Sequence, residues 1–269
     1  MESKIMQEIA KRIDLGEKVA LVTLISVNGS SPGKSGNIMG VFFDKTTLGT
    51  IGGGNLEFQV INSALEAMKI GENREFEFSL KADGKLDMIC GGKVKGYIKV
   101  FQRRKKLIIA GGGHLGLDLY KLGKYLKMYT VIIDDREEYV TENRFPQADE
   151  LLCGDIGEIL ENYPLDDSSY LVIVTRGHLG DKSALRSTVG RKAAYIGMIG
   201  SRKKVVESYR NLIKEGLEKN DLLDIYSPIG LDISSGDPAE IALGIMAEIL
   251  KVKNNGTGKH MKEVKTINL

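Results

Sequence analysis

A glycine-rich turn in the middle of the chain has the spacing of a phosphate-binding loop. Gly111, Gly113 and Gly116 form the pattern Gly-x-Gly-x-x-Gly. The apolar residues 106–110 before it predict a buried strand, and residues 114–126 predict a helix. Free N–H groups at a helix start bind phosphate, and glycine lets that phosphate approach the backbone closely. The turn is therefore typical of a dinucleotide-binding βαβ unit.

Two adjacent acids occupy the position where such a unit usually binds ribose. Asp134 and Asp135 end the next predicted strand, at 129–134. A carboxylate there accepts a hydrogen bond from a ribose hydroxyl and disfavours a 2′-phosphate. Arg136 follows directly, so NAD and NADP both stay open. The alternative is a doubly wound domain that keeps its glycines only for packing.

Two later loops carry polar side chains to the ends of predicted strands. One contains Thr175 and His178, and the other contains Gly200, Ser201 and Arg202. Because the carboxyl ends of parallel strands line the ligand crevice, we expect both loops at a binding site. The second loop suits an anion. Its alternative interpretation is a serine helix cap with a solvated basic first turn.

The histidines near these loops are candidates for proton transfer. Histidine is the side chain whose ordinary chemistry suits proton transfer near neutral pH, so His178 is a candidate general acid–base. Asp181 begins the next predicted helix, as a partner for His178 or as a helix cap. His114 lies inside the glycine turn and would face a bound phosphate. A surface histidine beside a cap is the alternative for both.

The first hundred residues carry three further glycine-rich loops. Ser30 and Ser31 lie in the first, where backbone N–H groups suit a phosphate or polar ligand. Gly53 and Gly54 open a predicted helix that contains Glu57. That carboxylate either complements the helix dipole or acts in catalysis. Cys90 precedes two glycines, so its thiol is either reactive towards a soft metal centre or a small buried side chain.

The order of predicted elements indicates an α/β protein with two domains. Residues 1–102 predict an N-terminal α+β domain. Residues 103–252 alternate strands and helices, which predicts a Rossmann-like, doubly wound parallel sheet for nucleotide or cofactor binding. Residues 253–269 predict a flexible basic tail.

Composition narrows the classes of partner and compartment. The 269 residues are 42% apolar and 28% charged with a net charge of +2, which favours neither nucleic acid nor an anionic membrane. No apolar run is long enough to span a membrane. Two cysteines are too few for a disulfide framework, and with three histidines they show no metal-site spacing. We expect a cytoplasmic protein without a secretory leader.

Taken together and in order, these motifs resemble the XdhC/CoxI family. The resemblance covers about residues 15–252. It rests on the segments GSSPGKSG, GTIGGGNLE, CGG, IIAGGGHLG with its aspartate pair, TRGH, IGMIGSRKK, PIGLDI and DPAEIALGIMAEIL. The segments IGMIGSRKK and PIGLDI are far more specific than the glycine fingerprint.

The resemblance implies an accessory maturation factor for molybdenum hydroxylases such as xanthine dehydrogenase. Such a protein binds the molybdenum cofactor, which is molybdopterin with or without a nucleotide extension. It protects this cargo during sulfuration and assists its insertion into the apo-enzyme. The implied partners are a cysteine desulfurase, the apo molybdenum hydroxylase and a second copy of the chain in a homodimer. In this interpretation Cys90 contacts molybdenum.

Two other functions fit the same motifs. An NAD(P)-dependent oxidoreductase would use His178 or His114 as its acid–base and the first domain as its substrate pocket. A dinucleotide-regulated binding module would use the nucleotide only to control its affinity for a partner. The implied chaperone needs no hydride transfer, whereas the oxidoreductase requires it.

Overall fold

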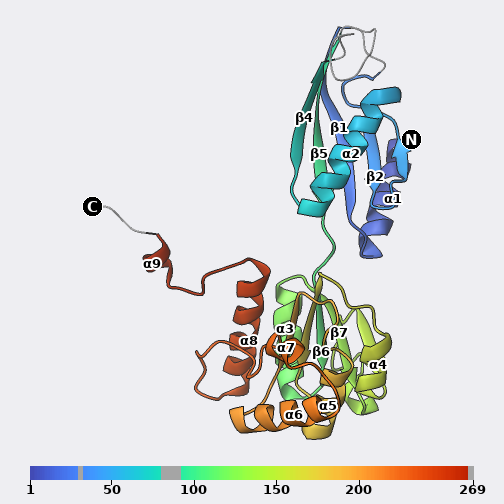
Figure 1. The fold of residues 1–269 in the computed structure, drawn as a ribbon. Helices are drawn as coiled ribbons and strands as arrows, with labels where there is room; N and C mark the ends of the chain where they lie inside the picture. The colour runs from blue at the N-terminus through green and yellow to red at the C-terminus, as the bar shows by residue number, and fades with distance from the viewer. Residues whose placement is uncertain (30–32, 80–91, 266–269) are drawn as a thin grey trace. The chain divides into compact units, whose positions relative to one another are not determined.

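The computed structural model describes residues 1–29, 33–79 and 92–265. The chain divides into two compact units, Met1–Arg104 (the N-terminal unit) and Lys105–Leu269 (the C-terminal unit) (Figure 1). The expected fold class is confirmed, because the first unit mixes helices with an antiparallel sheet and the second is built around a parallel one.

The N-terminal unit is an antiparallel sheet with strand order β3-β2-β1-β5-β4. Its elements in chain order are α1 (Glu2–Asp14), β1 (Val19–Asn28), β2 (Ile38–Phe42), β3 (Thr47–Gly49), α2 (Gly54–Ile70), β4 (Arg74–Ser79) and β5 (Lys93–Phe101). The short edge strand β3 lies in a stretch without an apolar run, and sequence periodicity did not indicate it.

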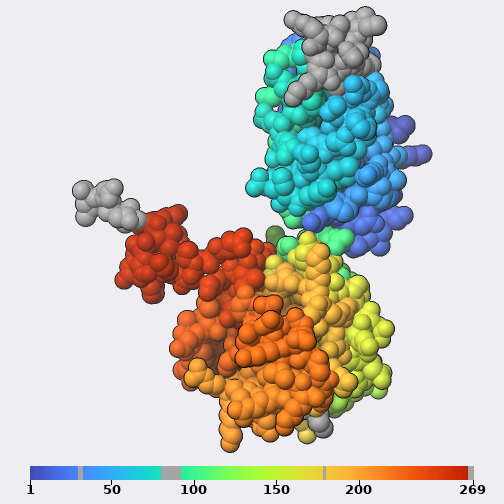
Figure 2. All heavy atoms as spheres, in the orientation of Figure 1, coloured from blue at the N-terminus to red at the C-terminus, as the bar shows by residue number. Residues whose placement is uncertain are grey.

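Alternating side chains on β1 give this sheet two buried faces. Ala20, Val22 and Leu24 join the larger core, which includes residues of α2. Val19 instead packs with Ile5 and other side chains beneath α1. The period of two follows from the pleat of a strand. Helix α2 lies in front of the strands in Figure 1, and the space-filling view of Figure 2 shows the side chains of this segment over that face.

The C-terminal unit is a parallel sheet with strand order β10-β9-β6-β7-β8. Its strands are β6 (Lys106–Ala110), β7 (Tyr129–Asp134), β8 (Glu150–Cys153), β9 (Ser169–Ile173) and β10 (Tyr195–Met198). The chain moves outward from β6 through β7 to β8, and then returns to the other side of β6 as β9 and β10. The β6/β9 boundary is therefore the topological switch point, where doubly wound sheets bind ligands.

Helices cover both faces of the parallel sheet. Its helices in chain order are α3 (His114–Tyr125), η1 (Glu137–Tyr139), α4 (Ile156–Asn162), α5 (His178–Arg186), α6 (Arg202–Lys214), α7 (Lys219–Leu223), α8 (Pro238–Lys253) and α9 (Met261–Val264). Residues of α3 and α8 share one core, and residues of α4, α5 and α6 share the other. Helix α5 begins three residues before its expected start at 181, and α9 lies within the expected tail.

Glu248 on α8 forms hydrogen bonds at the β10 edge of the parallel sheet. Its Oε2 accepts a hydrogen bond from the Tyr195 hydroxyl at 2.5 Å and from the Gly230 N–H at 2.9 Å. The Tyr195 ring stacks on Tyr226 with centroids 4.6 Å apart. Burial, together with the bond to Glu248, raises the pKa of Tyr195. One carboxylate therefore holds β10 and the loop before α8 together.

We predict that Glu248→Ala lowers the free energy of unfolding by about 2–3 kcal/mol, because buried Tyr195 and half-buried Gly230 lose a charged acceptor for their donors. Glu248→Gln should cost less, since its amide oxygen still accepts hydrogen bonds. Glu207→Ala, an exposed change on α6, is the control and should stay within about 0.5 kcal/mol. Urea denaturation followed by circular dichroism measures all three, and equal losses for Glu248→Ala and Glu207→Ala would contradict this role.

Candidate functional site

Three glycines at the β6–α3 junction, two in the turn and one in the first turn of α3, are required by packing. A Cβ on Gly111 would collide with the Val174 carbonyl, and the φ of Gly111 is +124°. A Cβ on Gly116 would collide with the carbonyl of Gly111, and one on Gly112 with that of Tyr139. These positions must be glycine because backbone from neighbouring segments lies against them.

Gly113 differs from the other glycines of the turn. A Cβ added there would meet nothing within 4 Å, and its φ of −64° is accessible to any residue. It is the N-cap of α3, so the free N–H groups of the first helical turn begin next to it. Packing does not require glycine at this position, and the open space beside it would let a ligand phosphate approach the backbone.

The Asp134 side chain fixes the glycine turn through hydrogen bonds. Its Oδ2 accepts a hydrogen bond from the Gly112 N–H at 2.7 Å, while the Arg144 Nε donates to the Gly112 carbonyl at 2.9 Å. Arg136 donates two hydrogen bonds to Asp134, from Nε to Oδ1 at 2.9 Å and from Nη2 to Oδ2 at 3.0 Å. Burial alone would raise the pKa of Asp134, but the hydrogen bonds from Arg136 and Gly112 outweigh it and lower the pKa.

The two adjacent acids thus differ in what they contact. The Asp134 side chain is only 2% exposed and bonds to the turn and to Arg136. The Asp135 side chain is 70% exposed, and its nearest guanidinium contact is Arg136 Nε at 3.7 Å. Asp135 therefore has the access that a ribose hydroxyl needs at the end of β7, and Asp134 shapes the turn.

A cavity of about 390 Å³ opens in front of this turn, which we call the fingerprint cavity. It is lined by Gly113, His114, Leu115, Arg136, Tyr139, Val174, Thr175 and Arg176. Arg136 lies over the Tyr139 ring at 3.7 Å, which orients its guanidinium. Basic side chains beside a helix N-terminus suit a phosphate or pyrophosphate.

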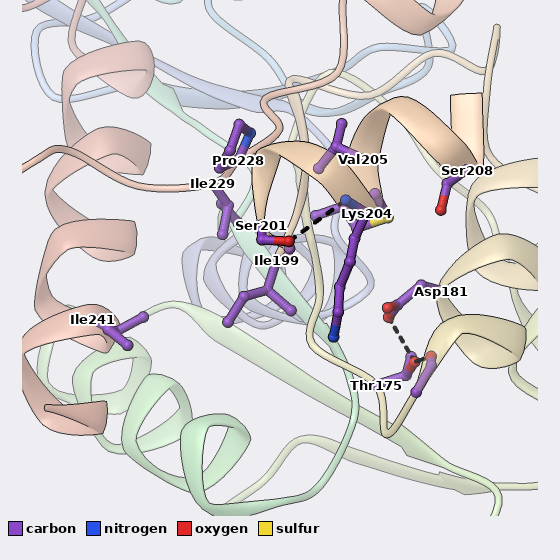
Figure 3. A pocket seen from close by; sticks show the side chains of 13 residues that line it. Thr175, Asp181, Ile199, Ser201, Lys204, Val205, Ser208, Pro228, Ile229 and Ile241 are labelled. Carbon is purple, nitrogen blue, oxygen red and sulfur yellow. Dashed lines mark hydrogen bonds between the residues drawn. The ribbon is translucent and has the colours of Figure 1, made fainter. Parts of the chain in front are cut away.

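A second cavity of about 480 Å³ lies at the ends of β9 and β10, which we call the α6 cavity (Figure 3). Its lining includes Thr175, Gly200, Ser201 and Lys204. The Thr175 hydroxyl donates to Asp181 Oδ1 at 2.6 Å. Because Thr175 lines both cavities, they adjoin along the carboxyl edge of the sheet.

The basic residues in the first turn of α6 line two different cavities. Gly200 and Ser201 line the α6 cavity as the sequence suggested, and Ser201 is the N-cap. Arg202 instead lines a shallow recess with Lys203 and Arg210. Lys204 lines the cavity, although sequence reasoning did not select it. Lys204 lies four residues before Ser208, on the same face of the helix, and this spacing was the available signal.

Glu57 forms hydrogen bonds with the backbone of a glycine turn in the N-terminal unit. Its Oε1 accepts hydrogen bonds from the N–H groups of Ile51 and Gly53 at 2.9 Å each, and from the Thr50 hydroxyl. Burial opposes ionisation, but these bonds outweigh it and lower the pKa of Glu57. Gly53 and Gly54 have φ values of +78° and +62°, as the turn requires.

Several candidate residues lie outside what the structure describes. Ser30, Ser31 and Cys90 fall in the ranges 30–32 and 80–91, and the His178 side chain is likewise outside the description. Their roles stay predictions. Within residues 1–29, 33–79 and 92–265, no group of three or more His, Cys, Asp or Glu side chains has a metal-binding arrangement. In the same ranges no helix is long and apolar enough to cross a membrane.

We predict that Asp134→Asn destabilises the C-terminal unit by about 2–3 kcal/mol at pH 7, because Arg136 and the turn lose a charged acceptor. The lowered pKa of Asp134 gives stability that is complete above about pH 4 and is lost as the pH falls through the lower folded-state value. The difference in free energy of unfolding between wild type and Asp134→Asn should therefore shrink as the pH falls. Denaturation at several pH values tests this, with Asp135→Asn as a near-neutral control; a gap independent of pH would contradict it.

Family models match both units of the chain. The model described as the XdhC Rossmann domain matches residues 107–249, and the model described as the XdhC and CoxI family matches residues 13–79. The first alone covers more than half of the chain.

Two curated proteins are similar to this chain in sequence. The Escherichia coli protein named "Uncharacterized protein YqeB" is 29% identical over 258 residues, which is 94% of this chain and 47% of that protein. A Bacillus subtilis protein, named as a probable subunit of xanthine dehydrogenase, is 26% identical over 157 residues, which is 58% of this chain and 46% of that protein. The chain spans about half the length of these relatives.

A solved structure shares the fold. The crystal structure of a xanthine dehydrogenase from Bacillus halodurans is 19% identical with a TM-score of 0.52, over 96% of this chain and 98% of that one. At this identity the likeness concerns the fold alone. With the match of the Rossmann-domain model across residues 107–249, the chain belongs to the XdhC/CoxI family.

Proposed function

We propose that this chain is an accessory maturation factor of a molybdenum hydroxylase of the xanthine dehydrogenase type. It binds the molybdenum cofactor as cargo, and it assists sulfuration of the metal and insertion into the apo-enzyme. Membership of the XdhC/CoxI family supports the association, as does the likeness to the Bacillus subtilis protein whose name refers to xanthine dehydrogenase.

One observation carries the binding part of this proposal. Gly113 is the glycine of the fingerprint that packing leaves unexplained, and it opens on a cavity with basic side chains. Molybdopterin ends in a phosphate, which a nucleotide extension turns into a pyrophosphate. The α3 N-terminus with Arg136 and Arg176 suits either form, and exposed Asp135 suits the ribose of the extended form.

The proposal includes partners. A cysteine desulfurase supplies sulfur for the cargo, the apo molybdenum hydroxylase receives the cargo, and two copies of the chain form a homodimer. Cys90 is the proposed contact to molybdenum, because a thiolate is a soft ligand. We place these events in the cytoplasm.

Reconstitution tests the proposed function. Purified apo-hydroxylase is incubated with molybdenum cofactor, desulfurase and cysteine, with or without this protein, and hydroxylase activity is measured. We expect faster and more complete activation with the protein, and co-elution of molybdopterin with it in gel filtration. Bovine serum albumin at equal mass is the control. No retained molybdopterin and no gain in activation would overturn the proposal.

The same protein preparation distinguishes the alternative functions. An NAD(P)-dependent oxidoreductase would bind NAD or NADP and turn over a carbonyl or pterin substrate. A dinucleotide-regulated module would bind the nucleotide without turnover and change its affinity for a partner. Calorimetric titration with NAD, NADP and the molybdenum cofactor separates these cases, and the proposal requires preference for the molybdenum cofactor.

We predict that Gly113→Ala weakens binding of the molybdenum cofactor at least about tenfold, because its methyl group occupies the path of the phosphate. Its free energy of unfolding should stay within about 0.5 kcal/mol of wild type. Gly116→Ala should unfold the unit readily, since its methyl collides with the Gly111 carbonyl. Gly256→Ala, whose methyl would only touch Lys251 at ordinary distance, is the control. Unchanged affinity in a folded Gly113→Ala protein would refute this binding position.

A further inference from the structure

The guanidinium of Arg136 keeps one flat face for a ligand at the fingerprint cavity. The Tyr139 ring covers the other face, with the Arg136 Cζ 3.7 Å from the ring centroid. Among the described residues, the only other partners of the Arg136 side chain are Asp134 and Asp135, which lie at its edge. Arg136 lines the cavity, and its side chain is 23% exposed. The face opposite Tyr139 is therefore the one open to a ligand.

Two neighbours hold this guanidinium in a single orientation. Nε and Nη2 donate to the buried Asp134 carboxylate at 2.9 and 3.0 Å, which fixes the plane of the group. The Arg136 N–H also donates to Asp134 Oδ1, at 3.1 Å. A group that is fixed at its edge and on one face loses little conformational freedom when a ligand covers its other face. Aromatic rings and nucleobases are the groups that stack on such a plane.

The charges around Arg136 disfavour a second phosphate beside the ribose. The Asp134 carboxylate neutralises the guanidinium and occupies the edge that would bind a phosphate through two hydrogen bonds. Asp135 is exposed, and the exposed residues Glu137 and Glu138 of η1 add two more carboxylates. A 2′-phosphate at Asp135 would thus meet more negative than positive charge. The geometry favours a free 2′-hydroxyl, a choice that the sequence left open.

Arg136 also lies where the base of a bound nucleotide would follow. In the proposed arrangement the 5′ phosphate group lies at Gly113 and the ribose at Asp135. Arg136 comes directly after Asp135 in the chain and lines the same cavity as Gly113. A base is attached to the side of the ribose away from its 5′ phosphate. A nucleotide held at those two points therefore brings its base to the open face of Arg136.

We propose that the open face of Arg136 is a stacking platform for a nucleobase, and that the fingerprint cavity binds a nucleoside 5′-phosphate or 5′-diphosphate with a free 2′-hydroxyl. Every base has a flat face, so the platform selects nucleotides as a class rather than one base. For the cargo the inference rests on the proposed function. There it favours the nucleotide-extended molybdenum cofactor over molybdopterin alone, because only the extended form carries a base.

Two small ligands that differ only in the base test the platform. 5′-AMP and ribose 5-phosphate are titrated into the intact protein up to tens of millimolar, and binding is followed by NMR shifts of backbone amides. We expect 5′-AMP to bind at least about fivefold more tightly than ribose 5-phosphate. Cytidine 5′-phosphate should show the same preference over ribose 5-phosphate. No binding of 5′-AMP, or equal affinity for 5′-AMP and ribose 5-phosphate, would overturn the proposal.

Two substitutions remove the platform in different ways. Arg136→Lys keeps the positive charge but loses the planar face, and Tyr139→Leu removes the ring behind the guanidinium. Each should weaken 5′-AMP binding, Arg136→Lys at least about fivefold, and leave ribose 5-phosphate within about twofold. Arg210→Lys, an exposed change on α6, is the matched control and should change neither. Unchanged 5′-AMP affinity in both folded variants, or an equal loss for both ligands, would refute the platform.

The 2′ position gives the third arm of the test. Adenosine 2′,5′-bisphosphate should bind at least about threefold more weakly than 5′-AMP, and Asp135→Asn should narrow the difference. Tighter binding of the bisphosphate would contradict the proposed ligand class.

Two further outcomes separate this proposal from the proposed function. The expected 5′-AMP pattern in a protein that does not bind the molybdenum cofactor would support the platform and refute the proposed function. Equally tight binding of molybdopterin and of its nucleotide-extended form would refute the platform and leave the proposed function standing.

Discussion

The buried carboxylate of Asp134 is the interaction on which the candidate site depends. It accepts the Gly112 N–H and binds Arg136 through two hydrogen bonds. The glycine turn is thereby fixed against the end of β7, and Arg136 is fixed on the rim of the fingerprint cavity. Without this anchor the Gly112 N–H would lose its side-chain acceptor, and the hydrogen bond from Arg144 to the Gly112 carbonyl would remain. The N-terminal unit uses the same principle, since Glu57 binds the N–H groups of its own glycine turn.

The switch point of the sheet divides the site into two chemically different halves. On the β7 side, an exposed acid and a guanidinium stacked on a tyrosine surround the start of α3. On the β10 side, apolar walls surround the side chains of Lys204, Asp181 and Ser208. Thr175 stands at their junction. This order follows from the topology and from the helix starts that the topology places at one edge of the sheet.

Local signals in the sequence predicted the fold class and the glycine turn, because apolar runs and glycine spacing are local properties. Other features depend on contacts that a single sequence does not display. Asp134 and Asp135 are adjacent acids, and only burial separates the anchor from the exposed one. The rotation of α6, set by the burial of Val205, Ser208 and Leu212, turns Lys204 rather than Arg202 into the cavity. The short strand β3 has no apolar run to reveal it.

A crystal structure of the protein with the nucleotide-extended molybdenum cofactor tests the central claim most directly. The account predicts the pyrophosphate against Gly113 and the start of α3, and the ribose at Asp135. A cofactor bound in the C-terminal unit with its phosphate away from Gly113 would contradict it.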